Sequence, residues 1–186
     1  MLKPTLFLAF AMVLAACGGA EDFYVLPQAT PDTQVVVSAQ SIEVRDVILP
    51  AYVAEADILV QGADGALRPL DGAVWADDPR AGITQGLATR LDLGTSATAA
   101  AEPWPLFDGP DLRVQVIVTR MLARADGLLE FSGQFAVTSP TGARRDFLER
   151  FEIVTPYTGP TPQAIAAAAG QALTILSDQI ATRIAR

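Results

Sequence analysis

The chain has 186 residues, of which 51% are apolar and 18% are charged, so it can bury the core of one domain and is not disordered as a whole. Its formal net charge of -8 argues against a nucleic-acid partner and against a basic membrane-binding face. It contains no His, one Cys, and a single Lys at position 3. These absences exclude a His-assisted nucleophile, a His-ligated metal and an internal disulfide. We therefore expect no catalytic residue, no metal and no cofactor.

Residues 1–16 have the pattern of a secretory signal. Lys3 gives a positive start, residues 5–14 are almost wholly apolar, and small residues follow. The apolar stretch is shorter than the roughly 20 residues that a transmembrane helix needs. We predict a cleaved signal peptide over 1–16.

The segment Leu14-Ala15-Ala16-Cys17-Gly18 resembles the lipobox of bacterial lipoproteins. This resemblance implies that Cys17 receives acyl chains such as palmitate and becomes the first residue after cleavage. The alternative is an ordinary secretory signal with a chance Cys near its end. Gly18 follows the Cys where an Asp retains enteric lipoproteins at the inner membrane, so the resemblance implies anchoring at the periplasmic face of the outer membrane. We predict a lipidated tether over 17–22 and a single domain over 23–186.

The first half of that domain is predicted to hold strands at residues 23–26, 35–49, 56–61 and 67–75. The second of these is rich in β-branched residues, with a bulge expected at 38–41, and residues 27–33 form a turn-rich connection. Pro50 ends the long strand because proline cannot donate to a ladder. Asp64-Gly65 is a hairpin turn signal. We expect open strand edges near residues 50–60, where neighbouring copies can pair.

A helix is predicted from Asp78, as N-cap, and Pro79 to about residue 93, with Gly94 as its stop. Residues 95–109 are predicted to form a loop. Three strands follow at 113–123, 128–138 and 144–154, and their turn signals predict an antiparallel meander. Thr161-Pro162 begins a long last helix with one apolar stripe. This order predicts an α+β domain with an antiparallel-rich sheet and two helices packed on one face.

Two groups of carboxylates are candidate sites. Asp77 and Asp78 form an acidic pair, which the helix-start pattern assigns instead to capping. Asp108 and Asp111 flank a Gly-Pro turn, where a loose calcium site is the alternative to a solvated turn. A hydrolase acting through two acids requires a cleft with facing carboxylates.

Two further features are candidate binding sites. Arg144 and Arg145 can hold a lipid phosphate, although a solvated strand start is the favoured interpretation. Trp104 lies between two prolines in a loop and is a candidate for contact with a partner or with lipid headgroups. The alternative for Trp104 is a ring folded back on the core.

Several short motifs, in their order along the chain, resemble the PqiC-type ABC-transport auxiliary lipoproteins. These are the lipobox, Phe23-Tyr24-Val25-Leu26 soon after it, the strand running into Leu49-Pro50-Ala51-Tyr52, Val74-Trp75-Ala76 before the Asp-Pro helix start, Arg113-Val114-Gln115-Val116, and the Ala-rich last helix. The segment after Tyr52 departs from the family pattern, which has an Arg there.

The resemblance implies a non-catalytic, lipid-anchored periplasmic protein. Members of this family are partners of MCE lipid-transport systems and form ring-like homo-oligomers. We expect contacts with the MCE partner or with lipid at Pro50, Tyr52 and Trp104. The alternative is a structural or assembly lipoprotein of a different envelope complex.

Overall fold

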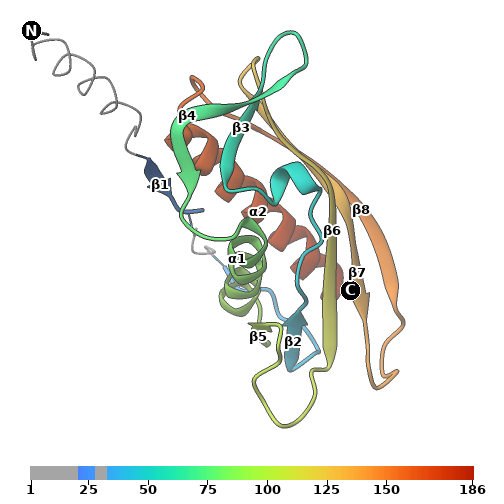
Figure 1. Cartoon of the computed structure of the whole chain (residues 1–186). Coiled ribbons are helices and arrows are strands. Elements are labelled where there is room, and N and C mark those ends of the chain that lie inside the picture. The colour runs from blue at the N-terminus through green and yellow to red at the C-terminus, as the bar shows by residue number, and fades with distance from the viewer. Residues whose placement is uncertain (1–20, 28–32) are drawn as a thin grey trace, which may run out of the picture.

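The computed structural model describes residues 21–27 and 33–186 (Figure 1). The predicted signal peptide, Cys17 and most of the predicted 27–33 turn lie outside these residues. Within them, eight strands form one mixed sheet, together with two α-helices and one turn of 3-10 helix. The elements are β1 (Asp22–Tyr24), β2 (Ser41–Val44), η1 (Ala51–Val53), β3 (Asp57–Gln61), β4 (Leu67–Trp75), α1 (Pro79–Gly94), β5 (Thr98–Ala101), β6 (Leu112–Arg124), β7 (Leu128–Thr138), β8 (Phe147–Pro156) and α2 (Pro162–Ile184).

The predicted meander is confirmed. β6, β7 and β8 pair antiparallel along nearly their whole lengths. β8 begins at Phe147, three residues later than predicted, because Asp146 closes the preceding turn by accepting a hydrogen bond from the backbone N–H of Ser139 at 2.9 Å. The strands alternate between buried and exposed residues, so only one face of the meander is covered.

The other edge of β6 is divided between two strands. β2 pairs in parallel with the first residues of β6, and β3 pairs in parallel with its last two residues. The predicted single strand over 35–49 is therefore wrong, because only Ser41–Val44 form a named strand. Val35 instead bridges Thr95 at the end of α1, and Ile48 bridges Ile117 of β6. The β-branched composition of residues 35–49 correctly indicated an extended backbone. This segment does not form one continuous strand, because its pairing partner changes along its length.

β5 is a second correction, because it lies inside the predicted 95–109 loop. Its residues are alanine and threonine, with little sequence signal for a strand, and it forms because the free edge of β2 offers parallel pairing. The predicted open edge near residues 50–60 is also wrong, since β3 lies between β4 and β6. Among the described residues the sheet ends at β1, β5 and β8.

Both helices begin where the sequence predicts. The Asp78 carboxylate accepts a hydrogen bond from the Arg80 N–H at 2.8 Å, and the Thr161 hydroxyl accepts one from the Ala164 N–H at 3.2 Å. Each helix has a proline in its first turn. Their buried faces pack on the covered face of the sheet, where Ile83, Leu87 and Leu91 of α1 meet the core that Leu173, Leu176 and Ile180 of α2 also line. This confirms the predicted α+β arrangement (Figure 1).

A buried arginine joins the helices. Arg90 of α1 is 2% exposed and donates hydrogen bonds to the Thr174 hydroxyl at 3.1 Å, to the Gly170 carbonyl at 3.2 Å and to the Pro27 carbonyl at 2.8 Å. Burial lowers the pKa of Arg90, and the negative charge of Asp178 opposes that shift. Arg90 thus ties the segment that follows β1 to both helices.

Candidate functional site

Pro50 and Tyr52 lie at the divided edge of β6. Pro50 precedes the 3-10 turn, and the Tyr52 hydroxyl oxygen accepts a hydrogen bond from the backbone N–H of Met121 at 3.3 Å. Both residues are half-buried. The turn therefore covers the stretch of β6 that neither β2 nor β3 pairs with, which is a structural role for this motif.

Trp104 lies in the loop between β5 and β6 and is half-buried. Its indole N–H donates to the carbonyl oxygen of Asp108 at 2.7 Å. This hydrogen bond links the two sides of the loop. The Trp104 side chain thus shapes the loop, while other residues form its exposed tip.

Leu106 and Phe107 form that tip, and sequence reasoning missed them. Leu106 is 58% exposed and Phe107 is fully exposed. An isolated exposed apolar residue is ordinary, but two consecutive large ones beside Trp104 form an apolar projection. The signal in the sequence was the run Pro-Trp-Pro-Leu-Phe over 103–107, in which two prolines restrict the backbone and so limit packing of the loop against the core. We call residues 104–107 the apolar loop tip.

The two ends of this loop are held firmly against β2. At one end, the carboxylate of Glu102 accepts hydrogen bonds from the Arg45 side chain at 3.3 and 3.4 Å and from the Asp46 N–H at 3.2 Å. The Arg45 hydrogen bonds, and then the Asp46 N–H, hold the pKa of Glu102 below its usual value. This stabilisation is present while Glu102 is ionised and is lost as the pH falls through the lowered pKa.

At the other end, the Asp111 carboxylate accepts hydrogen bonds from the backbone N–H groups of Gln40 at 2.7 Å and Ser41 at 3.3 Å. Asp111 therefore holds the start of β2, and Asp108 contributes its backbone carbonyl to the loop. Asp78 caps α1, and Asp77 accepts from the Asp78 N–H at 2.8 Å. No group of metal-ligating side chains that could hold an ion occurs among the residues that the structure describes.

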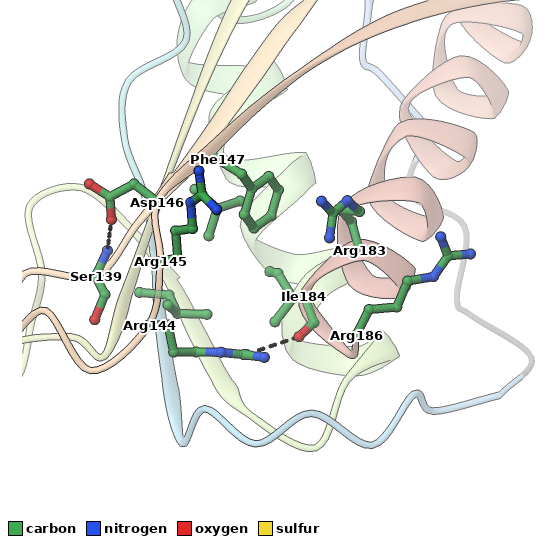
Figure 2. Close-up of a pocket in the computed structure, with 10 residues that line it drawn as sticks. Ser139, Arg144, Arg145, Asp146, Phe147, Arg183, Ile184 and Arg186 are labelled. Carbon is green, nitrogen blue, oxygen red and sulfur yellow. Dashed lines mark hydrogen bonds between the residues drawn. The ribbon is translucent and has the colours of Figure 1, made fainter.

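A cavity of about 500 Å³ lies where the β7–β8 turn meets the end of α2 (Figure 2). Four arginines line it, and we call it the arginine pocket. Arg144 and Arg145 come from the turn, and Arg183 and Arg186 come from the end of α2, some forty residues later in the sequence. Sequence reasoning found the first pair alone, because nothing in the sequence places the end of the last helix beside that turn.

Apolar side chains form the floor of the arginine pocket. Leu112, Val137 and Ile184 are buried, and Phe147 is half-buried. They come from the start of β6, the end of β7, the end of α2 and the start of β8. The cavity is thus lined by cations above a short hydrocarbon surface.

Two of the four arginines have protein partners. Arg144 donates to the backbone carbonyl of Ile184 at 2.9 Å (Figure 2). The Arg183 guanidinium lies 4.5 Å from the centre of the Phe147 ring and is hydrogen-bonded to Glu149. These contacts hold Arg144 on the turn side of the pocket and Arg183 on the helix side. Arg144 satisfies a carbonyl at the end of α2, where a positive charge is also favoured by the helix dipole.

Arg145 and Arg186 are exposed, and neither side chain has a partner within residues 21–27 and 33–186. Figure 2 shows Arg145 beside Phe147 on the turn side and Arg186 on the helix side. The pocket therefore combines two fixed cations with two free ones.

Comparison with known proteins identifies the family. Residues 24–181 match the family described as the ABC-type transport auxiliary lipoprotein component. The chain belongs to this family. A search of curated protein sequences finds no significant match.

Solved structures share the fold of this auxiliary lipoprotein. The crystal structure of an uncharacterized protein superimposes with a TM-score of 0.71 at 19% identity, over 89% of this chain and 99% of that chain. A protein from Xanthomonas campestris gives a TM-score of 0.63 at 19% identity, over 89% and 94% of the two chains. The resemblance to this family that the motifs indicated is confirmed. In the described part of the auxiliary lipoprotein, no helix is long and apolar enough to cross a membrane.

Proposed function

We propose that this auxiliary lipoprotein is a non-catalytic, lipid-anchored periplasmic component of an MCE-type ABC transport system that moves lipids between the inner and outer membranes and so maintains envelope integrity. The observation that carries the proposal is the family match over residues 24–181, which spans nearly all of the predicted domain over 23–186. The motifs that resemble the PqiC-type lipoproteins support the MCE partner.

The N-terminal segment supports anchoring at the outer membrane through Cys17. A triacylated Cys buries enough methylene groups to hold a protein firmly, at about 0.8 kcal/mol each. The tether over 17–22 spans only some 20 Å when extended. Replacing Cys17 with Ala should leave the protein unanchored or uncleaved, which membrane fractionation and intact mass determine. An unchanged mass and unchanged fractionation would contradict lipidation.

The apolar loop tip is the proposed contact with the MCE partner. Figure 1 shows the β5–β6 loop at the end of the molecule away from β1, to which the tether leads. A tip on that side faces away from the anchoring membrane, which favours a protein partner over that bilayer. The hydrogen bonds at Glu102 and Asp111 hold the tip in place before binding.

The β8 edge is the proposed contact between copies in a homo-oligomer. β8 is ten residues long and, within the part of the chain that the structure describes, pairs only with β7, so its other side offers backbone groups to a neighbouring strand. It replaces residues 50–60 in this role, since β3 lies between β4 and β6 in the sheet and pairs with β6 at Val60 and Gln61. Light scattering at high protein concentration tests for a closed oligomer, and a monomer at every concentration would contradict it.

Co-purification with an MCE protein from the same organism tests the proposed partner. We expect Leu106→Ser with Phe107→Ser to reduce recovery of that protein at least tenfold. Val36→Ser is the matched control, because Val36 is 81% exposed and lies outside the loop. Recovery that is unaffected by the loop variant would contradict docking at the tip. Absence of the MCE protein from the parent preparation would favour a different envelope complex.

A further inference from the structure

We propose that the arginine pocket binds the phosphate group of a small ligand, either a lipid headgroup or a free phosphate. The inference rests on the geometry of the pocket and not on the proposed function, so either can fail without the other.

The first argument is the concentration of positive charge. Four arginines line one cavity of a chain whose formal net charge is -8. Among the described residues, two side-chain carboxylates lie at or beside the pocket: Asp146 lines it, and Glu149 is paired with Arg183. Cations therefore outnumber these carboxylates. Cations gathered in a cavity repel one another, and that repulsion is relieved when an anion enters.

The second argument is that the four arginines differ in whether they have protein partners. Arg144 and Arg183 are held by Ile184, Phe147 and Glu149, so they are in place before a ligand arrives. Helix-end stabilisation accounts for these two. It does not account for Arg145 and Arg186, whose guanidinium groups have no protein partner in the described part of the chain. In Figure 2 the Arg145 side chain lies on the turn side of the pocket, and the Arg186 side chain extends from the end of α2 away from the other arginines. Both side chains are exposed, so a change of rotamer can bring each of them to an anion in the cavity.

The third argument concerns the chemical class of the ligand. The planar fork of a guanidinium donates two parallel hydrogen bonds to the oxygens of a phosphate. Several guanidinium groups can share the oxygens of one phosphate group. The cavity of about 500 Å³ is far larger than a phosphate alone and leaves room over the apolar floor for an attached group.

Isothermal titration calorimetry of the full chain, purified in an uncharged detergent, tests this proposal. The probes are inorganic phosphate, dihexanoyl phosphatidic acid and the phosphate-free dihexanoylglycerol, all at one ionic strength. We expect Arg145→Gln with Arg186→Gln to weaken binding of the phosphate-bearing probe tenfold or more. Arg80→Gln with Arg120→Gln is the matched control, since it removes the same charge from exposed positions outside the pocket.

The outcomes separate the sources of phosphate. Tighter binding of the phosphatidic acid than of inorganic phosphate identifies a lipid headgroup, and equal binding identifies a free phosphate. Equal affinity in the pocket variant and in the control would overturn the proposal. So would the absence of saturable binding of either phosphate probe to the parent protein, or binding of dihexanoylglycerol as tight as that of the phosphatidic acid. Circular dichroism of each variant establishes that it is folded.

Discussion

Arg90 and the free arginines of the arginine pocket carry the same side chain in opposite surroundings. Arg90 is buried between α1 and α2, and hydroxyl and carbonyl oxygens from three segments accept its hydrogen bonds. Arg145 and Arg186 are exposed beside the cavity, and no group among the described residues accepts a hydrogen bond from either side chain. A guanidinium whose donors are satisfied by the protein stabilises the fold, whereas an exposed one that lines a cavity and lacks a protein acceptor is available to a ligand. The comparison predicts that stability and anion binding depend on different arginines.

The largest effect is expected from Arg90→Met. We expect this change to lower the free energy of unfolding by about 3 kcal/mol, because it removes the hydrogen bonds that a buried charged donor makes to Thr174, Gly170 and Pro27. Chemical denaturation measures the change. Arg80→Met is the control, since Arg80 is exposed on the same helix and should change stability by less than about 0.5 kcal/mol. Equal effects of the two substitutions would contradict the structural role of Arg90.

A smaller effect is expected from Gly170→Ala. A Cβ at this position would lie 2.8 Å from the Pro27 carbonyl oxygen, so the segment after β1 must move. We expect a net loss of about 1 kcal/mol, with overpacking exceeding the gain in helix propensity. In Gly82→Ala the Cβ meets only a Leu26 methyl at 3.5 Å, so that variant should be more stable than the parent. Thermal melts of both variants test this, and stabilisation by both would show that the segment yields easily.

Arg183 is the intermediate case, because it lines the pocket and also has protein partners. Arg183→Gln should cost about 0.5–1 kcal/mol, since it removes the contact with the Phe147 ring and a partly exposed ion pair with Glu149. A double-mutant cycle with Phe147→Leu isolates the ring contact. A coupling energy of zero in that cycle would mean that Arg183 is not fixed by the ring.

The smallest effect on stability is expected from Arg145→Gln with Arg186→Gln. The unfolding free energy of this double variant should stay within about 0.5 kcal/mol of the parent, because neither side chain has a partner among residues 21–27 and 33–186. The same preparation should lose phosphate affinity at least tenfold, while folded Arg90→Met protein should retain it. A double variant that is strongly destabilised would assign these arginines to the fold.

Local features of the chain were predictable from the sequence. The meander follows from alternation within β7 and from turn residues at short separations, and its register needs only neighbouring segments. The starts of α1 and α2 follow from Asp78-Pro79 and Thr161-Pro162, because capping is a contact between residues two or three positions apart. The family resemblance likewise depended on short motifs in order.

Features that depend on distant partners were not predictable. β5 forms because an edge of β2 lies beside it. Residues 35–49 divide because their partner changes from Thr95 to the start of β6, and then to Ile117 farther along the same strand. The Arg90 hydrogen bonds join segments more than sixty residues apart. Phe107 is exposed because its loop is held at both ends by contacts with the β2 region.

The sequence by itself determined the α+β class, the helix starts, the meander and the family, because each depends on periodicity or on contacts close along the chain. Only the tertiary structure brought Arg183 and Arg186 to the turn that carries Arg144 and Arg145. The physical reason is that the end of α2 is placed by burial of its apolar stripe against β7 and β8. That burial depends on the apolar residues of α2 and not on the charged residues at its end. No local pattern in the sequence therefore encodes the arginine pocket.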